Sequence, residues 1–377
     1  MQRDDKPERL SSLFLLITVL IVFFGVVMVF SSSYMWAKDQ HGSSTHFVVK
    51  QLMFVALGFG VAVLLARTRL TFWYKHAYKV HAVFTGILML TLVPGIGVMI
   101  KGSQRWLNAG IMNVQPGEFV KYSLVLAAIR YFENFSAYDP RARAFYGLGL
   151  MLPLMIFLVQ PDFGTFAIAA MIVTFVAFLS HFPRKWFWSG AALGAVAALG
   201  ILFAAPYRVR RIMVFLDPWQ DPRNAGFQII QSFLAFANGG FSGQGLGNSN
   251  EKLFYLPEAY NDFIFSVVGE ELGFLGVAGI MLLYLGFIFI GLRIALSLRS
   301  RLGALLVSTV TFTIGFQAFL NMGVVLGVLP TKGLNLPFIS YGGSSMVANL
   351  AAVGLLFAAL RMKGTERTSG EGAALRR

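Results

Sequence analysis

The chain has 377 residues, of which 56% are hydrophobic and only 13% charged, and it contains no cysteine. Its mean hydropathy of +0.68 lies far above that of soluble globular domains and indicates a protein that crosses the membrane several times. The lack of cysteine excludes disulfides, thiol nucleophiles and thiolate metal sites. The net charge of +14 at pH 7 raises the question of nucleic-acid binding, which the distribution of the charges answers.

Ten apolar runs follow one another, and most reach the ~20 residues that a helix needs to cross ~30 Å of hydrocarbon. They are centred on residues 11–33, 46–66, 80–100, 116–131, 145–159, 164–182, 186–205, 263–292, 303–329 and 340–360. The first run is longer than a signal-peptide core, and no convincing small-residue cleavage motif follows it, so we expect it to remain as an anchor. We predict an all-α polytopic membrane protein with about ten transmembrane helices.

Lys and Arg residues are distributed unequally between the two sides of these predicted helices. With alternating sides counted from the N-terminus, about 20 of the 31 lie on the N-terminal side, about 10 on the other, and Lys121 within a helix. Because cytoplasmic loops carry the excess of positive charge, both termini are predicted to be cytoplasmic. The basic character therefore reflects membrane topology, and nucleic acid is not an expected partner.

One connection is much longer than the others and runs from about residue 206 to residue 261 on the outward side. A loop of this length in a compact protein is usually functional. Within it, residues 227–237 predict an amphipathic helix too short to span, lying at the interface or re-entrant and stopped at residues 238–240. Its predicted apolar face holds Phe227, Ile230, Phe233, Leu234 and Ala237. The glycine-rich residues 243–248 lack the strand and the lysine-serine pair of a phosphate loop, so they indicate turns.

The chain is predicted to form a single transmembrane domain over residues 1–363, followed by a disordered cytoplasmic tail over residues 364–377. The tail is rich in Gly, Ser, Thr, Glu and Arg, a composition that does not support a packed core.

Asp262 stands where the long loop gives way to a hydrophobic helix. An ionisable residue at such a boundary is costly unless it pairs, caps or reacts. If the helix begins at Asp262, steps of 100° place four small residues near the same face, namely Ser266, Gly269, Gly273 and Gly276. Two interpretations are open: Asp262 caps a helix whose small residues pack closely, or the small residues bound a cleft with the acid at its rim.

The fourth predicted helix opens with Gln115 and Pro116, and proline suits a first helical turn. Glu118 precedes Lys121 by three residues, a spacing that allows the two side chains to pair within the membrane. Such a pair is either a structural salt bridge or part of a polar cavity.

Two outward segments carry further polar groups. Asp162, in residues 160–165, is placed to cap the next helix. Residues 330–345 bring Lys332, hydroxyls and exposed backbone amides together before the last helix, a combination suited to an anionic head group, with a glycine-rich helix start as the alternative. The five histidines show no metal-ligand spacing, and Mg²⁺ or Mn²⁺ bridging a phosphate ligand to a carboxylate would leave none.

Taken together, these motifs resemble the SEDS family (shape, elongation, division and sporulation) of polytopic peptidoglycan glycosyltransferases. The resemblance covers nearly the whole transmembrane region and is carried by Arg105-Trp106, Gln115-Pro116, Glu118, Lys121, residues 160–165, Leu256-Pro257-Glu258, residues 262–265, residues 269–273 and residues 337–345. Residues 245–258 and 330–334 resemble the division branch more than the elongation branch. Gly117 departs from the usual serine, and residues 259–261 depart from the usual tripeptide before the acid.

The resemblance implies that Asp262 is the catalytic carboxylate in the polymerisation of lipid II, and that polyprenyl pyrophosphate leaves. The residues assigned to substrate binding are Arg105, Glu118, Lys121, Lys332, Ser340, Tyr341, Gly342, Gly343 and Ser344. The residues assigned a supporting role are Gln115, Pro116, Asp162, Pro257, Glu258 and Glu270. Weaker candidates for contacts with the pyrophosphate are Arg208, Arg210 and Arg211. No cofactor or metal site built by the protein is expected.

The same resemblance implies a location in the bacterial cytoplasmic (inner) membrane at the division septum, with the active site on the extracytoplasmic face. The expected partners are lipid II, the growing lipid-linked glycan, a class B penicillin-binding protein transpeptidase and other divisome proteins. Two other functions remain open: a flippase for lipid II, and a scaffold that only recruits the transpeptidase. A flippase needs a polar path through the full membrane depth, whereas the polar groups here gather toward the outward side.

Overall fold

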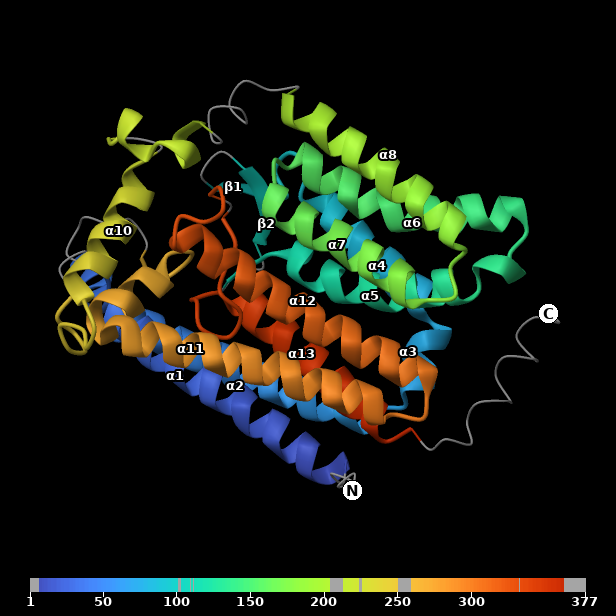
Figure 1. Ribbon diagram of the computed structural model, residues 1–377, viewed down its shortest axis with the longest axis horizontal. Helices are drawn as coiled ribbons and strands as arrows, with labels where there is room; N and C mark the ends of the chain where they lie inside the picture. Colours follow the sequence, from blue (N-terminus) through green and yellow to red (C-terminus); the bar gives the residue numbers. More distant parts are fainter. Residues whose placement is uncertain are drawn as a thin grey trace.

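The computed structural model describes residues 7–100, 103–108, 110, 112–203, 213–223, 226–249, 259–331 and 333–362, which form a bundle of long helices (Figure 1). In chain order the helices are α1 (Pro7–His41), α2 (His46–Arg67), α3 (Leu70–Lys75), α4 (Ala77–Leu90), α5 (Pro116–Glu133), α6 (Pro140–Val159), α7 (Phe163–Leu179), α8 (Arg184–Phe203), α10 (Phe227–Gly239), α11 (Ile264–Ser297), α12 (Arg301–Val325) and α13 (Gly343–Leu360). Short 3₁₀ turns lie at Phe135–Ala137 and Pro218–Gln220.

Each of the ten apolar runs overlaps one of these helices. Within the described ranges, six helices are long and apolar enough to cross a membrane, namely α1, α2, α6, α11, α12 and α13, while α4 and α7 are apolar but shorter. Helices suit lipid because they satisfy their backbone hydrogen bonds internally. The all-α polytopic fold is therefore confirmed, and the count of ten spans stays a prediction.

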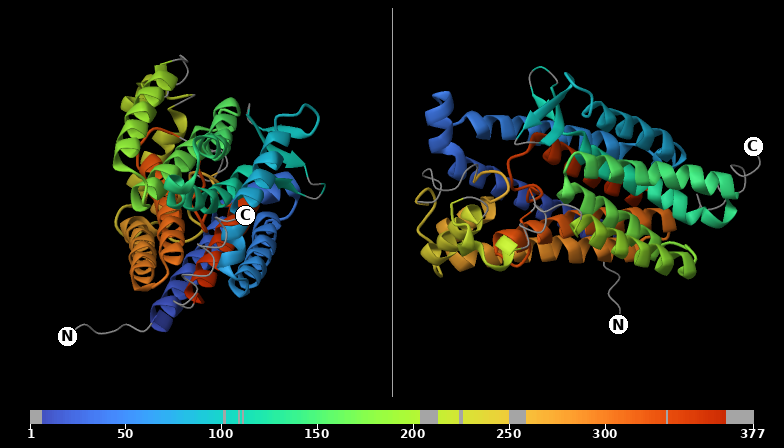
Figure 2. Two further views of the ribbon diagram at one scale, coloured as in Figure 1. Left: turned by 90° about the vertical axis from the view of Figure 1, so that its right-hand side faces the viewer. Right: turned by 90° about the horizontal axis from the view of Figure 1, so that it is seen from above.

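The helices pack in two groups that meet at α12 and α13 (Figures 1 and 2). In one group α2 packs on α13, and α11 packs on α12 and α1; in the other α5 packs on α4 and α7. Contacts of α12 and α13 with α5 join the groups. Small residues permit the closest approach, since a Cβ on Gly354 of α13 would lie 2.4 Å from the Ala62 carbonyl oxygen of α2.

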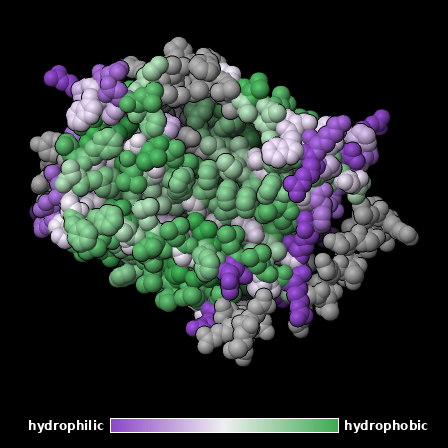
Figure 3. All heavy atoms as spheres, viewed as in Figure 1, coloured by the Kyte–Doolittle hydropathy of each residue, from purple (hydrophilic) through white to green (hydrophobic). Residues whose placement is uncertain are grey.

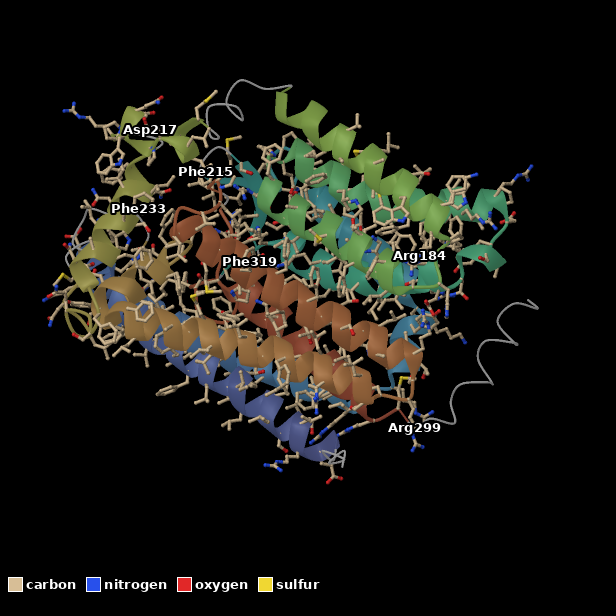
Figure 4. The ribbon with its side chains drawn as sticks, viewed as in Figure 1. Arg184, Phe215, Asp217, Phe233, Arg299 and Phe319 are labelled. Atoms are coloured by element: carbon tan, nitrogen blue, oxygen red, sulfur yellow. The ribbon has the colours of Figure 1, made fainter. Side chains whose placement is uncertain are left out.

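Polar and apolar side chains are segregated as expected for a membrane protein. Figure 3 shows apolar side chains over the middle of the visible face and hydrophilic ones mainly toward its ends. Arg184 and Arg299, both predicted to be cytoplasmic, lie at one end of the molecule, and Asp217 of the long loop lies at the other (Figure 4). The helix ends therefore agree with the predicted division of the loops into two sides.

A small sheet lies between α4 and α5, where no strand was predicted. Strand β1 (Gly97–Ile100) pairs antiparallel with β2 (Ser103–Asn108), which pairs antiparallel with β3 (Asn113–Val114). The third apolar run, predicted as helix up to residue 100, leaves the helix at Leu90. A short apolar run does not distinguish a strand from a helix, so Val98 to Ile100 were wrongly predicted to be the end of a transmembrane helix.

The helix predicted in the long loop is α10, which ends at Gly239, within the predicted stop. Its predicted apolar face was partly wrong, because Leu234 is 42% exposed and Ala237 is also exposed. The buried face consists of Ile229, Ile230, Ser232, Ala235 and Gly239. Helix α10 packs on α11, and Ser232 donates a 2.5 Å hydrogen bond to the Val325 carbonyl of α12. Protein contacts therefore decide its orientation.

Candidate functional site

Asp262 lies in a turn, residues 259–263, rather than at the start of a helix. Helix α11 begins at Ile264, and its N-cap residue is Phe263, which makes no side-chain cap. The interpretation of Asp262 as a helix cap was therefore wrong. The carboxylate is half-buried, and it stands against the loop that leads to α13, because a Cβ on Gly333 would lie 3.1 Å from Asp262 Oδ2.

The small residues that follow Asp262 provide close packing. A Cβ on Gly269 would lie 2.2 Å from Phe236 Cδ1 of α10, and one on Gly273 would lie 2.4 Å from the Gly243 backbone nitrogen. At Gly273 the backbone takes φ 63° and ψ −161°, so the helical step of 100° does not continue past this residue. Close packing is therefore confirmed for Gly269 and Gly273, which seat α10 and the turns after it.

The loop before α13 meets the turn of Asp262 through two hydrogen bonds, and a third lies within the loop. Ser340 Oγ donates to the Asn261 carbonyl at 2.7 Å and accepts from the Leu336 backbone N–H at 2.8 Å. The Tyr341 backbone N–H donates to the Tyr260 carbonyl at 2.9 Å. Burial raises the pKa of the Tyr341 phenol above its usual range, so this hydroxyl stays protonated. Ser340 and Tyr341, both predicted site residues, therefore lie beside Asp262.

Gln51 of α2 also holds this loop, and it was not among the predicted site residues. Its Nε2 donates to the Ser340 carbonyl at 3.3 Å, and its Oε1 accepts from the Gly342 backbone N–H at 3.5 Å. Gly343 packs against Phe54, since a Cβ there would lie 2.4 Å from Phe54 Cζ. A buried glutamine within an apolar helix was the available signal.

The start of α5 is attached to the start of α13. The Gln115 backbone N–H donates to Ser344 Oγ at 3.0 Å, and Pro116 occupies the first turn of α5 as predicted. Gly117, which differs from the serine that the family resemblance leads us to expect, packs against Phe157, whose Cε1 would lie 3.1 Å from a Cβ at this position. A serine side chain here would require Phe157 to move.

Glu118 and Lys121 form the predicted ion pair, with Lys121 Nζ 2.9 Å from Glu118 Oε2. Both are buried, Lys121 being 1% exposed. Lys121 also donates to Gln317 Oε1 of α12 at 2.7 Å. The pair therefore lies inside the bundle, and its contact with substrate stays a prediction.

Asp162 caps α7, as predicted, and in addition binds an arginine. Its Oδ1 accepts from the Thr165 backbone N–H at 3.1 Å and lies 3.3 Å from Arg105 Nη1. Arg105 comes from β2 and is fixed by a 2.6 Å hydrogen bond from its Nε to Ser103 Oγ. This group adjoins the loop before α13, because a Cβ on Gly164 would lie 2.7 Å from the Leu334 side chain. The unpredicted sheet therefore brings Arg105 to the site.

Glu270, predicted as a supporting residue, is fully buried and accepts a hydrogen bond from Ser249 Oγ. Its neighbour Glu271 accepts from Ser31 Oγ of α1 at 2.6 Å. Their carbonyls accept from the backbone N–H groups of Gln244 and Gly245. Both residues thus attach residues 244–249 to α11. The prediction of turns at residues 243–248 is confirmed.

Several predicted residues lie outside the described part of the chain: Lys332, Pro257, Glu258, Arg208, Arg210 and Arg211. Over the ranges that are described, no group of three or more His, Asp or Glu side chains is placed to hold a metal ion. Mg²⁺ or Mn²⁺ carried by a phosphate ligand stays a prediction.

The fold and this site define a polytopic helical membrane protein with a half-buried carboxylate at a junction of two loops. The chain matches the FTSW_RODA_SPOVE family model, described as "Cell cycle protein", over residues 11–364. It therefore belongs to the FtsW/RodA/SpoVE family, which confirms the resemblance to SEDS proteins.

Relatives from several bacteria match nearly the whole chain. A "Probable peptidoglycan glycosyltransferase FtsW" of Geobacter metallireducens is 38% identical and covers 95% of this chain and 96% of its own. The protein of the same name from Nitrosococcus halophilus is 40% identical over 90% and 89%. Stage V sporulation protein E of Bacillus subtilis is 35% identical over 91% and 95%. The expected likeness to the division branch is confirmed by the name FtsW.

Solved structures share the fold. A chain from a peptidoglycan synthase complex, studied for the coordination of polymerization and crosslinking, has a TM-score of 0.73 and 30% identity, covering 92% of this chain and 96% of its own. The rod shape determining protein RodA of Thermus thermophilus has a TM-score of 0.67 and 25% identity, covering 92% and 95%.

Proposed function

We propose that this protein is a peptidoglycan glycosyltransferase that joins lipid II into glycan strands, with Asp262 as its general base. Membership of the family and relatives named peptidoglycan glycosyltransferase support the activity. One observation carries the assignment of Asp262: the turn that bears it meets the loop before α13, with Gly333 against its carboxylate. A carboxylate held in this way on a rigid support is suited to proton abstraction.

In the proposed reaction, the sugar 4-hydroxyl of one lipid II molecule attacks the anomeric carbon of a polyprenyl-pyrophosphate-linked chain, with inversion. A bond forms between the 4-oxygen and the anomeric carbon, while the bond from that carbon to the pyrophosphate oxygen breaks. The hydroxyl proton passes to the ionised Asp262, and the pyrophosphate leaves with the electron pair. Nearby cations stabilise the charge that develops on the leaving group.

Arg105 and Lys332 are the cations that we assign to the pyrophosphate. Arg105 is partly exposed, and its contacts with Asp162 and Ser103 orient the guanidinium. Lys121 is 1% exposed and already paired, so we assign it to support of the site. Mg²⁺ or Mn²⁺ accompanying the pyrophosphate is a further proposal, which the addition of a chelator to the polymerisation assay tests.

We also propose that the protein acts in the bacterial inner membrane at the division septum, with Asp262 on the extracytoplasmic side. New glycan strands must be crosslinked, so a class B penicillin-binding protein transpeptidase is the proposed partner, together with other divisome proteins. The likeness to a chain of a peptidoglycan synthase complex supports a partner of this kind.

The test is a polymerisation assay with purified protein and labelled lipid II, run with and without the transpeptidase. Asp262→Asn should abolish glycan synthesis, whereas Asp39→Asn, an exposed carboxylate at the end of α1, should leave it unchanged. Equal synthesis by wild type and Asp262→Asn would refute the assignment. Translocation of lipid II in liposomes without any polymerisation would favour a flippase, and normal division by an Asp262→Asn strain would favour a scaffold.

A further inference from the structure

Two amide side chains lie one turn apart on α12, at Gln317 and Asn321. Both are buried, with exposures of 1% and 2%. Four residues of separation place them on the same face of the helix. An amide within a membrane helix is costly unless its hydrogen bonds are made, so their partners indicate why they are present.

Asn321 joins the two segments that meet at the site. Its Nδ2 donates to the Asp262 carbonyl at 2.8 Å and to the Leu334 carbonyl at 2.6 Å. The two N–H groups of one planar amide therefore donate to carbonyls of two different segments, neither of which is helical. Asn321 thus bridges the turn of Asp262 and the loop before α13, in addition to the direct bonds that Ser340 and Tyr341 make between them.

Gln317 extends this connection to the buried ion pair. Its Nε2 donates to the Asn335 carbonyl at 2.9 Å, and its Oε1 accepts from Lys121 Nζ at 2.7 Å. The carbonyls of the consecutive residues Leu334 and Asn335 are therefore held by the same face of α12. The Glu118–Lys121 pair is attached to the loop through this glutamine.

The acceptor side of Asn321 contributes no hydrogen bond within the described part of the chain, so its value lies on the donor side. Asn321 Oδ1 is buried, and no described residue donates to it. A buried acceptor without a donor costs about 1–3 kcal/mol, whereas an apolar residue of similar size would avoid that cost but leave the Asp262 and Leu334 carbonyls without this donor. The two bonds to the loop segments are what the asparagine adds.

We infer that Gln317 and Asn321 are positioning residues that fix the Asp262 carboxylate against the loop before α13 and link both to the Glu118–Lys121 pair. The inference rests on the proposed role of Asp262 as general base. Neither amide touches the substrate in this arrangement; each acts by holding backbone. Asn321 bonds the Asp262 carbonyl directly, whereas Gln317 acts through Asn335, so the loss of Asn321 should have the larger effect.

The experiment compares Asn321→Leu and Gln317→Met with Thr313→Val, which removes a buried hydroxyl that bonds only its own helix, to the Thr309 carbonyl. Turnover and apparent KM for lipid II are measured on full-length protein, and thermal unfolding in detergent shows that each variant is folded. Asn321→Leu should lower kcat about 10- to 100-fold, since a shift of the base by ~1 Å has an effect of that order. Its KM should stay within about twofold of the wild-type value. Thr313→Val should match the wild type.

A second measurement separates positioning from general structural support. In an Asp262→Glu background the carboxylate is already displaced, so Asn321→Leu should lower kcat by less than about threefold, because coupled residues are non-additive. Wild-type turnover in Asn321→Leu, a raised KM with unchanged kcat, or equal losses in both backgrounds would each overturn the inference. If Asp262→Asn polymerises normally, the general-base assignment fails first; if only Asn321→Leu is normal, the positioning role alone fails.

Discussion

Removal of Glu118 tests whether the buried ion pair serves stability, catalysis or both. In Glu118→Gln, Lys121 keeps its hydrogen bond to Gln317 but loses an opposite charge 2.9 Å away. With an effective dielectric constant of about 20, that attraction is roughly 6 kcal/mol, and desolvation offsets part of it. Breaking a buried pair from one side costs about 3–5 kcal/mol. Because the Gln317 contact remains, we expect a loss near 3 kcal/mol, which lowers the folding equilibrium constant roughly a hundredfold.

The measurement is thermal or denaturant unfolding in detergent, beside Glu118→Gln combined with Lys121→Met. The double variant removes both charges, so it should recover most of the lost stability. Its polymerisation activity then isolates the chemical role: a stable but inactive double variant places the pair in the function, and an active one makes it structural. Unchanged stability of Glu118→Gln would refute the reasoning, because Lys121 would then not depend on its partner.

Two further substitutions test the packing at Gly273 and the ion pair between α5 and α12. Gly273→Ala places a Cβ 2.4 Å from the Gly243 nitrogen, on a residue whose φ is 63°. It should therefore lower the thermal unfolding midpoint by an amount that corresponds to about 1–3 kcal/mol or more. A Cβ on Gly279 would meet open space, so Gly279→Ala should leave the midpoint unchanged. Arg301 donates to Glu133 through Nε at 2.7 Å and through Nη2 at 3.1 Å, so Arg301→Lys should lose the bidentate geometry. The pair is partly exposed, so the same measurement should show a loss of about 1 kcal/mol or less; a larger loss would contradict the expected solvent screening.

Local chemistry in the sequence was sufficient for several features. The hydrophobic runs predicted the helices because burial in lipid requires about 20 apolar residues whatever the neighbours are. The three-residue spacing of Glu118 and Lys121 predicted their pairing, and the turn at residues 160–165 predicted the Asp162 cap, because both contacts are made within one helical turn. The end of α10 at Gly239 was also predicted, because glycine is a local signal for the end of a helix.

The approach of distant segments could not be predicted from local pattern. The sheet at residues 97–114 brings Arg105 to Asp162, and no local signal paired them. The face of α10 was misjudged because its contacts with α11 and α12, rather than its hydrophobic period, orient it. Gln317 and Asn321 were visible as amides in an apolar helix, but their partners lie on other segments.

Hydropathy and helical spacing are properties of neighbouring residues, so they were enough to establish a bundle of membrane helices with a carboxylate at a loop boundary. Contacts between distant segments were needed to show that Asp262 does not cap α11 and instead meets Gly333 and the loop before α13. Irregular backbone inside a bundle must bond to the side chains that surround it, and here these come from α2, α12 and the loop itself, which no local pattern specifies.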